Sequence, residues 1–219
     1  DFDGWAKRPG LESWSYSHVL PYFKRLENRR IGGDDYRGED GPLHLETPEC
    51  ASPLFEAFFQ AAEQAGYPRT EDVNGYQQEG FGRFDRTTWR GRRWNAARAY
   101  LHPVLSRPNL EVRCGVLVRR IVFEGTRAVG VEVLDRGRVA VIRGGEVLCC
   151  GGAINSPQLL QLSGIGSAER LEPLGIEMVH DLPGVGEALE DHAEVYVQYA
   201  CTQPVSLYPA LKWWRQPWI

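Results

Sequence analysis

Short apolar runs rich in β-branched residues dominate the middle of the chain. Gly125 and the pair Arg136-Gly137 separate them, as is typical of tight turns between strands. The pattern predicts an antiparallel meander that leads into a further apolar run at 147–150, which is long enough for a buried strand and too short for a helix. The runs lie at 110–112, 117–123, 128–134 and 139–142.

Helical spacing of apolar residues dominates the first hundred positions. It predicts a helix over 16–27, a second that begins at Ser52-Pro53 and ends before Gly66, and a third from 96 to 101 with Asn95 as its N-cap. The second helix is expected to bury Leu54, Phe55, Phe58, Ala61, Ala62 and Ala65.

A glycine turn and a helix follow the run at 147–150. Gly151-Gly152 would end the strand, and Ser156 and Pro157 would serve as N-cap and first position of a helix that ends at Gly164. Nucleotide-binding α/β domains bring backbone amides to a cofactor in this way. On the glycines alone, a tight turn in an ordinary α/β domain is the better interpretation. Beyond it we expect a short helix from Ser167 to Leu174, a turn-rich loop at 181–186 and a strand at 194–200.

Composition restricts the classes of function. A net charge of −4 argues against a nucleic-acid partner, because phosphate binding needs a concentrated basic surface. The cluster Arg90, Arg92 and Arg93 is either a solvated loop or an anion site. Five cysteines without a repeated C-x-x-C spacing are expected to be reduced and buried. The histidines lack the spacing of a metal site, so the sequence predicts none. No apolar run is long enough to predict a membrane span.

The string Gly152-Ala-Ile-Asn-Ser-Pro-Gln-Leu-Leu-Gln-Leu-Ser-Gly-Ile-Gly166 resembles, at every defined position, the second signature of the glucose–methanol–choline (GMC) family of FAD-dependent oxidoreductases. Further matches extend the resemblance over essentially the whole chain: Asp1-Phe-Asp-Gly-Trp5, Asp40-Gly-Pro-Leu43, Gly80-Phe-Gly82 and Gly91-Arg-Arg-Trp94.

The resemblance implies a fold and a domain division. The class is α/β, with part of a Rossmann-like FAD-binding domain and part of an α+β substrate-binding domain. Residues 1–105 would hold linker or lid helices and the first part of the substrate domain. Residues 106–187 would belong to the FAD-binding domain, and 188–219 would begin a second substrate-domain segment.

The same resemblance assigns cofactor contacts. Pro108-Asn-Leu110 and Gly115-Val-Leu-Val118 resemble the strand beside the FAD adenine, where Val118 would contribute its backbone. The loop Gly184-Val-Gly-Glu-Ala-Leu-Glu-Asp-His192 resembles a family loop near the cofactor, with Ala188 where Asn is usual. The residues implied to bind FAD are Val118, Gly151, Gly152, Asn155, Asp191 and His192.

Choline-oxidising members of the family are the most similar, through segments 74–82, 191–194 and 203–214. They hold the trimethylammonium group of choline with a glutamate and a tryptophan, and Glu194 and Trp213 stand at the matching positions. A quaternary ammonium cannot donate a hydrogen bond, so aromatic faces and a carboxylate suit it. Considered singly, a glutamate such as Glu194 is more often a surface residue, and a tryptophan such as Trp213 is more often a packing residue.

The implied reaction is oxidation of choline to betaine aldehyde with hydride transfer to the flavin. The base would lie beyond Ile219 and the G-x-G-x-x-G motif before Asp1, so no catalytic residue is assigned here, and His192 would orient its loop. The alternatives are another GMC alcohol dehydrogenase and a non-catalytic fold fragment. The resemblance suggests membrane association, at the bacterial or mitochondrial inner membrane, without naming an electron acceptor.

Overall fold

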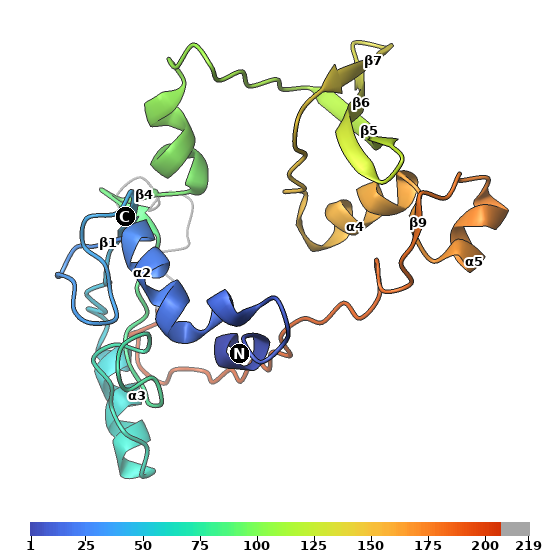
Figure 1. Ribbon diagram of the computed structural model, residues 1–219. Helices are drawn as coiled ribbons and strands as arrows, with labels where there is room; N and C mark the ends of the chain where they lie inside the picture. The colour runs from blue at the N-terminus through green and yellow to red at the C-terminus, as the bar shows by residue number, and fades with distance from the viewer. Residues whose placement is uncertain (207–219) are drawn as a thin grey trace. The chain divides into compact units, whose positions relative to one another are not determined.

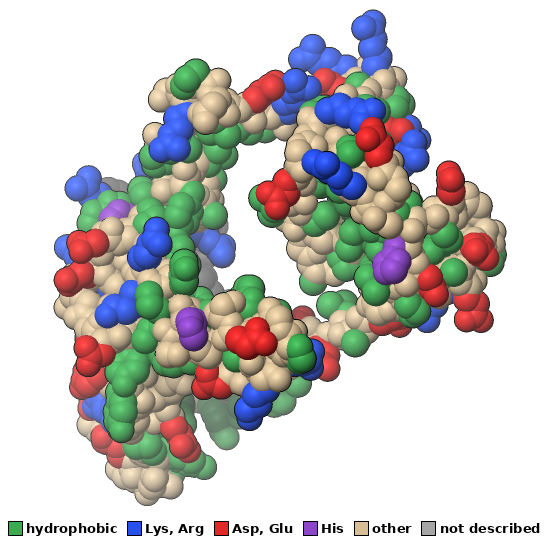
Figure 2. Space-filling view, in the orientation of Figure 1, with side chains coloured by type: hydrophobic (Ala, Val, Ile, Leu, Met, Phe, Trp, Pro, Cys, Tyr) green, Lys and Arg blue, Asp and Glu red, His purple; other side chains and the backbone are tan. Residues whose placement is uncertain are grey.

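The computed structural model describes residues 1–206, so Trp213 lies outside the described residues. The chain divides into two compact units. One comprises Asp1–Leu110 with the segment that begins at Gln198, and the other comprises Glu111–Val197. Figure 1 traces the elements of each, and Figure 2 shows hydrophobic side chains at the surface of both.

The first unit begins with short helices. These are α1 (Phe2–Trp5), the 3₁₀ turn η1 (Glu12–Trp14) and α2 (Tyr16–Leu26), the last close to the predicted bounds. Strand β1 (Glu27–Arg29) then pairs in parallel with β2 (Leu43–Leu45). The loop between them packs so closely that a Cβ at Gly38 or Gly41 would overlap the backbone of Lys24 or Leu26. Only glycine fits at these two positions.

Helix α3 (Pro53–Gln64) begins where predicted, and the Leu54 amide donates to Ser52 Oγ at 3.4 Å. The predicted buried face was largely wrong. Phe59 and Ala62 are buried, whereas 57% of Phe58 is exposed. Phe59 is covered because the Arg69 guanidinium lies over its ring, 4.8 Å from the centroid. The unit also contains the hairpin β3 (Thr88–Trp89) and β4 (Arg92–Arg93), the π-helical turn η2 (Ala97–Leu101) and the 3₁₀ turn η3 (His102–Val104).

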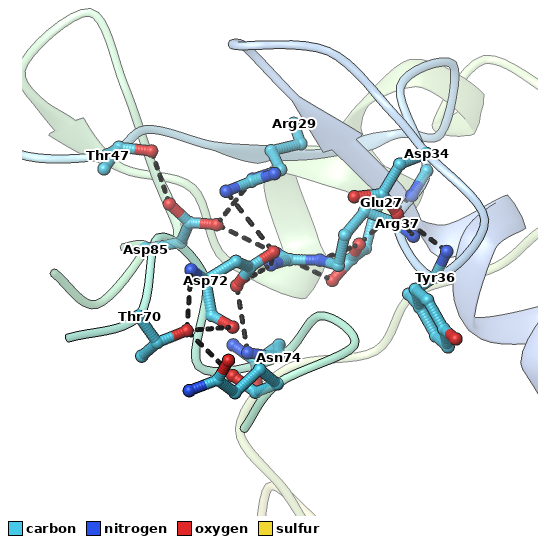
Figure 3. Close-up of polar contacts among 12 residues, drawn as sticks. Glu27, Arg29, Asp34, Tyr36, Arg37, Thr47, Thr70, Asp72, Asn74 and Asp85 are labelled. Atoms are coloured by element: carbon cyan, nitrogen blue, oxygen red, sulfur yellow. Dashed lines mark hydrogen bonds and ion pairs between the residues drawn. The ribbon is translucent and has the colours of Figure 1, made fainter. Parts of the chain in front are cut away.

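Two arginines and three carboxylates form a buried cluster in the first unit (Figure 3). We call it the Arg37 cluster; its members are Glu27, Arg29, Arg37, Asp72 and Asp85. The Arg37 side chain is 3% exposed, and it contacts Glu27 at 2.9 Å, Asp72 at 2.6 Å and Asp85 at 2.9 Å. Arg29 contacts Asp72 at 3.3 Å and Asp85 at 3.0 Å. The cluster joins β1 and the following loop to two later loops.

The predicted meander is confirmed in the second unit. Strands β5 (Val116–Glu124), β6 (Arg127–Asp135) and β7 (Arg138–Arg143) pair antiparallel in that order, and Ile121 and Val133 are buried. Helix α4 (Gly152–Leu162) packs against β5. Buried Ser163 joins the two, because its hydroxyl accepts from the Ile121 amide at 2.8 Å and donates to the Leu159 carbonyl at 2.5 Å.

The rest of the second unit follows α4. Strand β8 (Ile165–Gly166) pairs in parallel with β9 (His180–Asp181), and between them lie α5 (Ala168–Leu171) and the 3₁₀ turn η4 (Glu172–Leu174). Gly175 ends η4 with φ 74°, as predicted. Ser167 occupies the N-cap position without a side-chain bond, and the Asp181 carboxylate accepts from the Ala168 amide at 2.9 Å instead.

Three predicted strands are not present, at 110–112, 147–150 and 194–200. A strand requires a partner, and none of the described strands pairs with these segments. The predicted burial of the cysteines was also wrong: Cys50 is half-buried and the other four are exposed. Leu148, which was expected to be buried in a strand, is 77% exposed.

Helix α4 begins earlier than predicted, at Gly152, with Pro157 inside it. Ser156 is therefore not its N-cap. Its hydroxyl instead accepts from the Gly151 amide at 3.0 Å, which closes the turn before the helix. None of the helices in residues 1–206 is long and apolar enough to cross a membrane.

Candidate cofactor and substrate site

The start of α4 presents open backbone amides. Gly151, Gly152 and Asn155 are all exposed, and Gly152 has φ 85°, which favours glycine. The Gly151 amide already donates to Ser156 Oγ, so the open amides are those of the first helical turn, beginning at Gly152. A Cβ at Gly152 would meet nothing within 4 Å, so the space before the helix is free. The first amides of a helix have no partner within it and attract anionic groups. These residues are therefore able to hold a phosphate-bearing cofactor.

A pocket of about 660 Å³, which we call the α4 pocket, runs between α4 and the loop that follows Gly184. Ile154, Pro157 and Gln161 line it from the helix, and Val185 and Leu189 line it from the loop. Its volume is in the range of sites for small molecules and cofactors. The two motifs that the sequence suggested, the helix signature and the loop ending at His192, thus meet in one pocket, whose lining does not include Val118 or Glu194.

Val118 lies in β5, as predicted, opposite Val133. The strand register shifts between Val118 and Arg120, which is a β-bulge, and bulges occur often beside functional sites. Arg119 and Arg120 both contact the Glu132 carboxylate at 3.0 Å. The bulge therefore interrupts regular pairing directly after the residue expected to contribute its backbone to adenine.

Asp191, His192 and Glu194 lie on an exposed segment. The His192 amide donates to the Asp191 carboxylate at 2.8 Å, so this pair orders its own turn. The Tyr196 hydroxyl donates to Glu194 at 2.5 Å, and this bond raises the pKa of Tyr196. The sequence interpretation did not include Tyr196, although its spacing of two residues from Glu194 was the available signal.

The geometry does not indicate a metal centre. Within residues 1–206, no group of three or more His, Cys, Asp or Glu side chains could hold a metal ion.

The sequence-family model of the GMC oxidoreductases matches residues 1–194. The chain belongs to the GMC oxidoreductase family. The family and the α/β fold class expected from the sequence are thereby confirmed, and the lining of the α4 pocket consists of GMC motifs.

Several relatives cover the whole chain. The oxygen-dependent choline dehydrogenase of Pseudomonas syringae pv. tomato is 58% identical over 100% of this chain and 39% of its own length. The enzyme of the same name from Escherichia coli O17:K52:H18 is 56% identical over 100% of this chain and 40% of its own length. The chain therefore spans about two-fifths of these relatives.

Solved GMC-like structures support the fold. Pyridoxine 4-oxidase from Mesorbium loti is 34% identical, with a TM-score of 0.77 over 83% of this chain and 36% of that one. An FAD-dependent oxidoreductase from Chaetomium thermophilum is 29% identical, with a TM-score of 0.75 over 84% of this chain and 34% of that one.

Ala188 is expected to be a destabilising residue in the loop at 184–192, which we call the GMC loop. It adopts φ 52°, a left-handed conformation that costs alanine about 1–2 kcal/mol and that asparagine and glycine tolerate better. An asparagine at this position would thus relieve backbone strain, in addition to any contact that its side chain makes with the flavin. Ala188→Asn and Ala188→Gly should each stabilise the chain by about 0.5–1 kcal/mol, measured by urea denaturation.

The comparison between the two variants separates the two roles of the asparagine. If only the backbone matters, both variants bind FAD alike, whereas an amide contact with the cofactor tightens FAD binding in Ala188→Asn alone. A loss of stability in both variants would show that position 188 does not carry this strain.

Proposed function

We propose that this chain is part of a longer FAD-dependent enzyme, the parent enzyme, that oxidises choline to betaine aldehyde. The observation that carries the FAD-dependent part of the proposal is the α4 pocket, in which the GMC signature helix meets the loop leading to Asp191, His192 and Glu194. Similarity to choline dehydrogenases over 100% of the chain supports the same substrate.

FAD is the cofactor of this family, and the residues present fit it. The open amide of Gly152 at the start of α4 suits its diphosphate, and Gly151, whose own amide donates to Ser156 Oγ, has no Cβ to block the approach. The backbone of Val118, beside the bulge, suits the adenine. Asn155, Asp191 and His192 remain proposed contacts. When bound, FAD would supply the two-electron acceptor for the alcohol.

Glu194 is proposed to bind the substrate cation. Its carboxylate is exposed and held by Tyr196, with no described arginine or lysine within ion-pair distance. A quaternary ammonium has no proton to donate, so charge and aromatic faces must bind it. Trp213 is the proposed aromatic partner from the sequence.

A different alcohol remains the second candidate. The solved relative at 34% identity is a pyridoxine 4-oxidase, whose named substrate carries no quaternary ammonium. The α4 pocket alone suits both cases, because it would hold the cofactor rather than the substrate. Association of the parent enzyme with a bacterial or mitochondrial inner membrane is proposed from the resemblance to choline-oxidising members.

The direct test is an assay of the full-length parent enzyme. With choline and an artificial electron acceptor it should form betaine aldehyde and carry a flavin absorbance spectrum. Oxygen consumption in the absence of the artificial acceptor identifies whether oxygen serves instead. A flavin-containing enzyme that leaves choline unchanged but oxidises an uncharged alcohol would favour the second candidate, and a colourless protein would contradict the enzyme proposal.

A further inference from the structure

Gln161, in the last turn of α4, is in direct contact with the GMC loop. Its side-chain amide donates to the Val185 carbonyl at 2.9 Å in a partly buried position. The next residue, Gly186, has φ 83°, and a Cβ there would lie 2.6 Å from Gln161 Nε2. The amide therefore lies directly against the loop backbone, where a Cβ would displace it and where the positive φ favours glycine.

The other contacts of this loop are weaker or independent of side chains. Arg170 and Glu187 form an ion pair with side chains 65% and 43% exposed, and exposed pairs contribute little. The Leu182 amide donates to the Gly166 carbonyl at 2.8 Å through backbone alone. Among the described residues, Gln161 is the partly buried side chain that hydrogen-bonds this loop from α4.

We propose that Gln161 is a positioning residue for substrate recognition. It holds Val185 and Gly186 against α4. It thereby fixes the point at which the GMC loop departs from α4, and hence the positions of Asp191, His192 and Glu194. It touches neither substrate nor reacting atoms, and acts through the loop. This inference rests on the proposed function, because it assigns Glu194 to the substrate cation.

The test uses the full-length parent enzyme and two alcohols of nearly the same shape. One is choline, and the other is 3,3-dimethylbutan-1-ol, in which carbon replaces the charged nitrogen. Gln161→Met keeps the side-chain volume and removes the donor. It should lower the ratio of kcat/KM for choline to kcat/KM for the neutral alcohol about fivefold, the effect of one hydrogen bond, with flavin content unchanged.

Two further measurements link the effect to the loop and to Glu194. Hydrogen–deuterium exchange in residues 184–192 should be faster in Gln161→Met than in the wild type, because the tether is lost. Adding Gln161→Met to Glu194→Gln should lower the substrate ratio no further. Gln161→Glu offers a second variant, since a carboxylate cannot donate to Val185. Arg170→Gln is the matched control for a loop contact and should change the ratio less.

The outcomes separate the inference from the function. An unchanged substrate ratio, an equal loss with both alcohols, or unchanged exchange in 184–192 would overturn the role of Gln161. A wild-type enzyme that does not prefer choline over the neutral alcohol would overturn the proposed function. In that case the exchange measurement still decides whether Gln161 holds the loop.

Discussion

Replacement of Arg37 with methionine is expected to destabilise the protein by about 3–5 kcal/mol, the usual cost of removing one partner from a buried ion pair. The side chain is 3% exposed and compensates three carboxylates. Its loss leaves Asp72 and Asp85 with Arg29 alone and leaves Glu27 without an ion-pair partner among the described residues. Burial lowers the pKa of Arg37, but hydrogen bonds to Glu27 and Asp72 outweigh it and raise that pKa above its usual value. Urea denaturation followed by tryptophan fluorescence measures the loss.

Matched variants show whether burial is the cause. Arg143→Met removes an ion pair with Glu124 in which both side chains are 65% exposed, and it should cost at most about 1 kcal/mol. Arg37→Lys keeps the charge but cannot make the forked contacts, so it should lie between the two. Equal effects of Arg37→Met and Arg143→Met would contradict the prediction.

Acid provides an independent readout of the same cluster. Burial raises the pKa of Asp85, but the Thr47 hydrogen bond and the charges of Arg29 and Arg37 outweigh it and hold the pKa below its usual value. A carboxylate with a lowered folded pKa stabilises the fold above its unfolded pKa, near 4, and this contribution is lost as the pH falls through the folded value. Arg37→Met should therefore show a smaller loss of stability on acidification than the wild type.

Local signals in the sequence predicted much of the fold correctly. The alternating runs and turn glycines located β5, β6 and β7, because strand pairing across a two-residue turn is fixed by neighbouring residues. Ser52-Pro53 located the start of α3 for the same reason, since a cap acts within one helical turn.

Contacts between distant residues could not be predicted in this way. Arg29 and Asp85 are 56 positions apart, and nothing in either segment indicates that they meet. The run at 147–150 was assigned to a strand from its composition, but a strand also depends on a partner, which the described residues do not provide. The same holds for the site. The sequence motifs identified α4 and the GMC loop, whereas the hydrogen bond between Gln161 and Val185 could be seen only in the structure.

Replacement of Glu194 with glutamine in the full-length parent enzyme is expected to lower kcat/KM for choline by about 30-fold, which corresponds to about 2 kcal/mol. A full charge pair at 4 Å is worth about 4 kcal/mol in a protein-like dielectric, and solvent exposure of Glu194 reduces this. Because choline cannot donate a hydrogen bond from its nitrogen, the glutamine amide oxygen cannot replace the lost charge. Steady-state kinetics measures the change.

Tyr196→Phe is the matched control for Glu194→Gln. It removes the hydroxyl that donates to Glu194 at 2.5 Å but keeps the carboxylate and the ring, so the loss should stay within about fivefold, the effect of one hydrogen bond. The neutral alcohol should react with Glu194→Gln nearly as well as with the wild type, since it has no charge to bind. Unchanged choline kinetics in Glu194→Gln would assign this carboxylate to the protein surface and favour an uncharged alcohol as the substrate.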